Sequence, residues 1–201
     1  MNLDRNICAF IAIGAAGGEG LSDVKALLSR LNPQIKAAVL VVLRRSPRDM
    51  SDLQGALNGN SSMPVVIATG GEQLASGVVY IGEPGAHLSL APNLFCSLIA
   101  DPEGADRNSA VDLLFESVAR HAGTQGIGIV LSGSRDDGSR GLDAIHNAGG
   151  LTMVFTPDDG RPPGMPENAV DYSGLVDVIG DIDTLASVIN EALCPQPVGQ
   201  H

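Results

Sequence analysis

The feature that most constrains the fold is an apolar run that leads directly into a cluster of glycines. The run covers residues 7–13, and the next segment with a clear pattern, residues 21–31, has apolar positions at helical spacing. Four glycines lie between the two segments: Gly14, Gly17, Gly18 and Gly20. A buried strand, a tight turn and a helix in this order predict the first unit of a doubly wound α/β domain.

Ligands of such sheets bind beyond the carboxyl ends of the strands, beside helix N-termini that attract negative charge. The turn at residues 14–18 contains only glycine and alanine, so it offers no nucleophile, acid or base. Its spacing also departs from GxGxxG. Arg44 and Arg45 follow the second predicted strand, where an NADP enzyme could contact the 2′-phosphate. The alternative is that both arginines are simply solvated.

The rest of the chain alternates between strand and helix patterns, which predicts a mostly parallel, Rossmann-like sheet. Further strands are predicted at residues 35–43, 63–68, 126–131, 151–155 and 175–179. Further helices are predicted at residues 50–57, 109–121, 142–147, 167–171 and 182–193. Short β-type runs between glycines at residues 78–81 and 86–90 predict an appended β-hairpin, with one more strand near 94–100.

Composition limits the possible partners. The net charge is −11 and the 12 Lys and Arg residues are scattered, which argues against binding to nucleic acid or an anionic membrane. No apolar run reaches the length of a bilayer span and no signal peptide is evident, so we expect no membrane insertion and a cytoplasmic location. Cys8, Cys96 and Cys194 are dispersed, so we expect core thiols and no metal site. One domain is expected over residues 1–194, with a frayed tail at 195–201.

Polar residues concentrate in the turn after the fourth long strand, at residues 132–138. A carboxylate there could orient a catalytic histidine, or Asp136 or Asp137 could cap the helix that begins near Gly138. Tyr80 and His87 flank the predicted hairpin turn, where they could line a cleft or pack in the core.

Five segments resemble, in order, the catalytic domain of the CheB-type chemotaxis protein-glutamate methylesterases. They are AIGAAGG at 12–18, GVVYIGEPGAHL at 77–88, SAVDLLFESVA at 109–119, LSGSRDDGSRGLDAIHNAGG at 131–150 and GMPENAVDYSGLVDVI at 164–179. Five collinear segments are more specific than any single motif. The resemblance implies an enzyme that hydrolyses γ-glutamyl methyl esters of chemoreceptors, and deamidates certain glutamines, with a Ser–His–Asp triad.

The same resemblance shows where this chain departs from the family pattern. Asp137 matches the triad acid. In the first glycine turn the chain is one residue shorter and reads Ala15-Ala16, so Ala16 either replaces the serine or follows its missing position. At the histidine position the chain is one residue longer, and either Arg44 or Arg45 takes that place.

These departures remove the chemistry that ester hydrolysis requires. Alanine has no nucleophile, and arginine stays protonated and cannot act as a general base. The leading hypothesis is therefore a catalytically inactive, cofactor-free CheB methylesterase-like domain that binds a methyl-accepting chemoreceptor or another signalling protein. The candidate binding residues are Gly17, Gly18, Arg44, Arg45, Ser134, Arg135 and Met165. The three arginines would form a positive patch suited to a carboxylate or phosphate.

Two alternatives remain. One is an active methylesterase or deamidase that uses Ser46 or Ser134 with Asp137, for which His87 is the only histidine in a motif near the family's cleft. The other is an NADP-binding enzyme. Many relatives carry an N-terminal receiver domain, and the first strand predicted from residue 7 leaves no room for one. We therefore expect regulation by a partner or a ligand.

Overall fold

The computed structural model describes residues 7–44, 52–82, 85–101, 109–133, 136–156 and 164–194. Its centre is a seven-stranded sheet with the order β3-β4-β2-β1-β7-β8-β9, in which every strand pair is parallel. The strands are β1 (Ala9–Ala16), β2 (Ala37–Arg44), β3 (Val65–Ile67), β4 (Val78–Ile81), β7 (Gly126–Val130), β8 (Leu151–Phe155) and β9 (Val178–Gly180). The predicted doubly wound α/β fold is confirmed.

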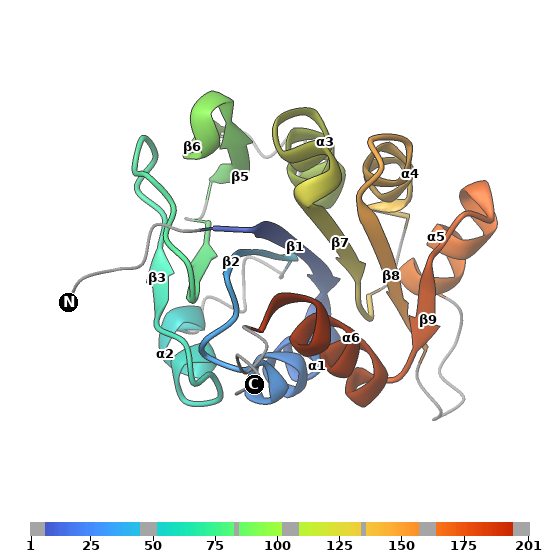
Figure 1. Cartoon of the computed structure of the whole chain (residues 1–201), viewed down its shortest axis with the longest axis horizontal. Coiled ribbons are helices and arrows are strands. Elements are labelled where there is room, and N and C mark those ends of the chain that lie inside the picture. The colour runs from blue at the N-terminus through green and yellow to red at the C-terminus, as the bar shows by residue number, and fades with distance from the viewer. Residues whose placement is uncertain are drawn as a thin grey trace, which may run out of the picture.

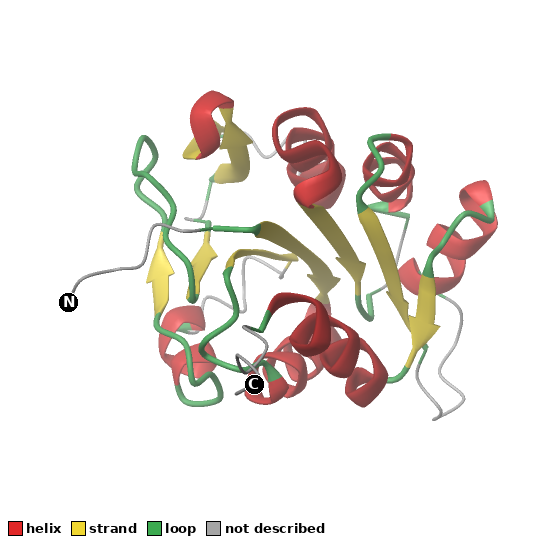
Figure 2. Cartoon of the chain, viewed as in Figure 1, coloured by secondary structure: helices red, strands yellow, loops and turns green. Residues whose placement is uncertain are grey.

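Helices cover both faces of the sheet (Figures 1 and 2). On one face lie α1 (Gly17–Arg30), α2 (Leu53–Asn58) and α6 (Ile182–Leu193). On the other lie α3 (Ala110–Ala122), α4 (Ser139–Asn147) and α5 (Met165–Ser173). No helix among the described residues is both long and apolar enough to cross a membrane.

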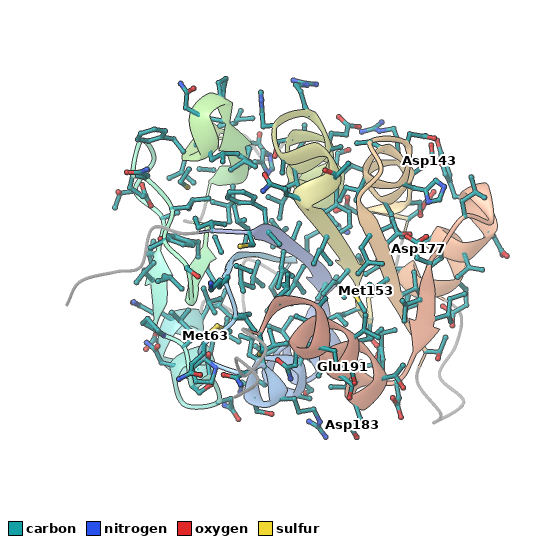
Figure 3. The ribbon with its side chains drawn as sticks, viewed as in Figure 1. Met63, Asp143, Met153, Asp177, Asp183 and Glu191 are labelled. Atoms are coloured by element: carbon teal, nitrogen blue, oxygen red, sulfur yellow. The ribbon has the colours of Figure 1, made fainter. Side chains whose placement is uncertain are left out.

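Two hydrophobic cores result from the alternation of side chains along the strands. Ile11 and Ile13 of β1 join the core under α1 and α6, whereas Phe10 and Ala12 join the core under α3 and α4. Met63 and Met153, labelled in Figure 3, belong to the first core. Strands that are buried on both faces explain the continuous apolar runs of the sequence.

The predicted hairpin exists, but between different strands. The sequence predicts that residues 78–81 pair with residues 86–90, but residues 78–81 form β4, which lies inside the main sheet between β2 and β3. The two-stranded antiparallel unit consists of β5 (Ala86–Ala91) and β6 (Phe95–Ala100), joined by a short 3₁₀ turn at Pro92–Leu94, and it packs beside α3. All four residues of β4 are buried, as expected of an inner parallel strand and not of an appended hairpin.

Two smaller predictions need correction. Cys8 is exposed, because β1 begins one residue later, at Ala9, whereas Cys96 is buried as predicted. Tyr80 does not flank a hairpin turn; it is buried in β4, where its hydroxyl accepts a hydrogen bond from the Ala75 N–H at 2.9 Å. The predicted tail at residues 195–201 lies outside the described residues.

Candidate functional site

The candidate site lies where β1, β2 and β7 end at the carboxyl edge of the sheet. Ala16, the last residue of β1, is paired in register with Arg44, the last residue of β2. The segment after β7 is tied to the same edge, because the Ala16 N–H donates to the Ser132 carbonyl at 3.0 Å and the Leu131 N–H donates to the Gly14 carbonyl at 2.9 Å. The topology therefore brings together the glycine turn, the arginine position and the polar turn of the sequence.

The glycine turn at the start of α1 has open space beside it. Gly17 has a φ of +73°, which favours glycine, and a Cβ built on Gly17 or Gly18 would meet no atom within 4 Å. The helix N-cap, Ala16, makes no side-chain capping bond. The N-terminal end of α1 is thus accessible from outside, as in anion-binding turns.

Ala16 itself is packed and almost fully buried. A Cβ built on Gly133 would lie 2.8 Å from the Ala16 Cβ and would also collide with the Met165 sulfur. The Met165 N–H donates to the Gly133 carbonyl at 2.8 Å, which fixes the start of α5 against this turn. Among the predicted binding residues, Gly17, Gly18 and Met165 are therefore close to Ala16, and Met165 contributes as a buried packing residue.

Asp137 lies at the centre of the site and is paired with Arg44. The Nε of Arg44 is 3.5 Å from Oδ2 of Asp137, and the two side chains are 16% and 0% exposed. The Asp137 carboxylate also accepts the backbone N–H of Val111 at 3.3 Å and of Asp112 at 3.0 Å. Asp137 therefore caps α3 and not the helix that begins near Gly138. Asp136, the other candidate for that cap, accepts a hydrogen bond from the Ser139 hydroxyl at 2.7 Å.

Burial raises the pKa of the Asp137 carboxyl to about 6, and the nearby Asp112 carboxylate contributes to this shift. The two N–H bonds and the Arg44 guanidinium act in the opposite direction. Because this pKa lies below neutrality, the Asp137 carboxylate is largely ionised at pH 7 beside a protonated arginine. Such a pair cannot take a proton from a nucleophile in the way that a neutral histidine can.

Asp112 is a site residue that the sequence analysis missed. Its Oδ1 accepts the N–H of Gly138 at 3.0 Å and of Gly141 at 2.8 Å, so it caps α4 from the neighbouring helix. Its Oδ2 lies 3.5 Å from Nη2 of Arg140. Burial raises the pKa of Asp112. Asp137, which precedes α4, thus caps α3, and Asp112, which lies in α3, caps α4.

Of the other candidate residues, His87 is described and four lie outside the described part of the chain. The Nε2 of His87 is 3.0 Å from Oδ2 of Asp101, and both side chains are buried. Arg45, Ser46, Ser134 and Arg135 lie outside the described residues. Among the residues that the structure describes, no group of three or more His, Cys, Asp or Glu side chains could hold a metal ion.

A model of the CheB methylesterase family matches residues 11–189, most of the chain. This chain belongs to the CheB methylesterase family. A protein-glutamate methylesterase/protein-glutamine glutaminase of Archaeoglobus fulgidus is 30% identical over 177 residues, which are 87% of this chain and 50% of the relative. A Yersinia pestis protein of the same name is 33% identical over 172 residues, or 84% of this chain and 49% of the relative. The chain therefore spans about half the length of these CheB relatives.

A solved structure supports the same fold. The crystal structure of the Thermotoga maritima CheB methylesterase catalytic domain superimposes with a TM-score of 0.81 at 23% identity, covering 92% of this chain and 98% of the other. At 23% identity this similarity supports the fold alone, so the chemistry of the site has to be argued from its own residues.

Proposed function

We propose that this chain is a CheB methylesterase-like domain that does not hydrolyse esters and that binds a chemoreceptor or another signalling protein. The observation that carries the proposal is the contact between Arg44 and Asp137 beside Ala16. Arg44, one of the two arginines that could take the place of the family's histidine, lies against Asp137, which matches the triad acid. Ala16, which either replaces the family's serine or follows its missing position, offers only a buried methyl group.

The chemical consequence is the loss of two functions. A Ser–His–Asp site needs a hydroxyl to attack the ester carbonyl and an imidazole to accept its proton. Arg44 remains protonated at any useful pH, and the Asp137 carboxylate is held by α3 and by the arginine. Loss of a triad member typically lowers kcat by several powers of ten. With both serine and histidine replaced, we expect at most the small residual acceleration that binding and oxyanion stabilisation can provide.

The two alternatives find less support in the site. An active enzyme that used a rearranged serine with Asp137 would still need a base, and the described partners of Asp137 are the Val111 and Asp112 N–H groups and Arg44, with no histidine among them. An NADP enzyme would need a dinucleotide-binding turn, and the glycine spacing after β1 departs from GxGxxG.

The surface that would bind the partner includes the accessible N-terminal end of α1 and the three arginines Arg44, Arg45 and Arg135. We propose that these arginines, of which Arg44 is described and Arg45 and Arg135 lie outside the described residues, meet a carboxylate of the partner, such as an unmethylated glutamate of a receptor. Binding of the purified receptor fragment should weaken about tenfold in the Arg44→Ala, Arg45→Ala double variant, as expected for loss of a charge-assisted contact. Unchanged binding would contradict the role of these arginines.

An activity-based probe tests the inactive half of the proposal independently of the partner. A fluorophosphonate labels serines that a neighbouring base has activated. We expect no labelling of the natural protein, with an active CheB methylesterase as the positive control. Labelling that maps to Ser46 or Ser134 by mass spectrometry would instead support a rearranged esterase.

A further inference from the structure

Two buried aspartates cap each other's neighbouring helices in a reciprocal arrangement. Asp137, which precedes α4, accepts N–H bonds from the first turn of α3, and Asp112 in α3 accepts N–H bonds from Gly138 and Gly141 at the start of α4. These four bonds join residues that are 25 to 29 positions apart in the sequence. The two helix starts are therefore fixed relative to each other.

Asp112 fixes the Asp137 carboxylate in two ways, once through its backbone N–H and once through its side chain. The backbone N–H of Asp112 donates to Oδ1 of Asp137 at 3.0 Å. The carboxylate of Asp112 holds the N–H of Gly138, the residue directly after Asp137. Gly138 has a φ of +101°, a conformation that favours glycine, and its N–H is held by Asp112.

An arginine lies at each end of the pair. Arg44 contacts Asp137 at the candidate site, and Arg140 contacts Asp112 on the outer side, where it also donates to Glu116 at 2.7 Å. Each buried carboxylate thus has two backbone N–H donors and one guanidinium. This pattern satisfies groups that would otherwise be costly to bury.

We infer that Asp112 is the positioning residue of the candidate site, which sets the place of the Asp137 carboxylate and, through it, of the Arg44 guanidinium. The inference rests on the proposed function only in that Arg44 and Asp137 form the proposed recognition site. The Arg44–Asp137 contact depends on Asp112 in the protein without any partner, whether or not these residues bind one.

The geometry separates two variants of Asp112. Both N–H bonds reach the same oxygen, Oδ1, so Asp112→Asn can keep them with its amide oxygen and loses only the charge that faces Arg140. Asp112→Ala loses both acceptors. Glu116→Gln is the matched control, because it removes the other carboxylate bound to Arg140, and none of the described contacts of Glu116 involves Asp137.

NMR on the full chain tests the inference without any partner. In Asp112→Ala, exchange of the Arg44 Nε–H with solvent should become about tenfold faster, whereas Asp112→Asn should stay within about twofold of the natural protein. In Asp112→Asn, the titration midpoint of the Asp137 carboxyl carbon should fall by about one pH unit, since a like charge has been removed. Glu116→Gln should change neither quantity.

The outcomes decide the inference even if Asp112→Ala does not fold. A folded Asp112→Ala with an unchanged Arg44 exchange rate would overturn it, as would a tenfold faster Arg44 exchange in Asp112→Asn, which keeps both acceptor bonds. Receptor binding by the same variants is a separate question. If the NMR results are as expected and binding is unaffected, the positioning role stands and the recognition role of Arg44 fails.

Discussion

Replacement of Arg44 by methionine should destabilise the protein at alkaline pH and hardly affect it at acidic pH. Methionine keeps much of the aliphatic stem and removes the guanidinium that lies 3.5 Å from the Asp137 carboxylate. Without the arginine, the buried carboxylate must either remain charged and unneutralised or take up a proton in the folded state. Whichever of these two states has the lower free energy sets the upper limit of the loss of stability.

The size of the effect follows from the pKa of Asp137, which burial raises to about 6. A pH of 8 is two units above the pKa of this carboxyl, so protonating it in the folded protein costs about 2.7 kcal/mol. The variant should therefore lose up to about 3 kcal/mol of unfolding free energy at pH 8. At pH 5 the carboxyl is already mostly protonated, and the loss should stay below about 0.5 kcal/mol.

The sign is consistent with linkage in the natural protein. The pKa of Asp137 is higher in the folded state than the 3.8 expected for the unfolded chain. The stability that this group contributes is present in acid and is lost as the pH rises through about 6. Removing Arg44 makes ionisation in the folded state less favourable still, so it deepens the loss on the alkaline side.

Urea unfolding at pH 5 and pH 8 measures both values. The chain has no tryptophan, so far-ultraviolet circular dichroism is the suitable signal. Arg120→Met is the control: Arg120 is exposed at the end of α3, and its loss should cost less than about 0.5 kcal/mol at either pH. An equal loss in Arg44→Met at both pH values would refute the reasoning, because packing alone would then account for it.

Three further predictions concern the packing around the site and the two cores. Gly133→Ala should lower the unfolding free energy by about 1–3 kcal/mol in urea titrations, because its new methyl collides with packed neighbours, while Gly18→Ala, which enters open space, should stay within about 1 kcal/mol of the natural protein. A maleimide should label Cys8 in the folded protein and spare Cys96, since Cys96 is buried and burial raises its pKa to about 12. Tyr80→Phe should cost about 1 kcal/mol in urea, because it removes a buried hydrogen bond to a backbone N–H.

The sequence predicts the fold well where long apolar runs decide it. The segments at 151–155 and 182–193 coincide with β8 and α6. β1 continues to Ala16, beyond the predicted end at residue 13, because glycine and alanine are small enough to extend a buried strand without altering the apolar pattern. The sequence predicts the hairpin with the wrong first strand, because four consecutive apolar residues fit an inner parallel strand as well as a hairpin strand.

The site was predictable only in part. The family resemblance indicated Asp137, Ala16 and Arg44, and the parallel register places the last two side by side. The contact of Arg44 with Asp137 and the role of Asp112 depend on tertiary packing. Ser109 and Asp112 fit the spacing of a capping box, yet Ser109 makes no capping bond and Asp112 caps α4. A local pattern cannot reveal a cap supplied by another helix.

Release of methanol from a methylated chemoreceptor tests the central claim most directly. The purified chain should be present in excess over receptor methyl groups, so that even a single slow turnover is detected, with an active CheB methylesterase in a parallel reaction. Because Ala16 has no hydroxyl and Arg44 cannot accept a proton, we expect methanol release at the rate of the receptor alone. Release above that rate by the natural protein, retained after Arg44→Ala, would contradict the account and point to a nucleophile elsewhere in the chain.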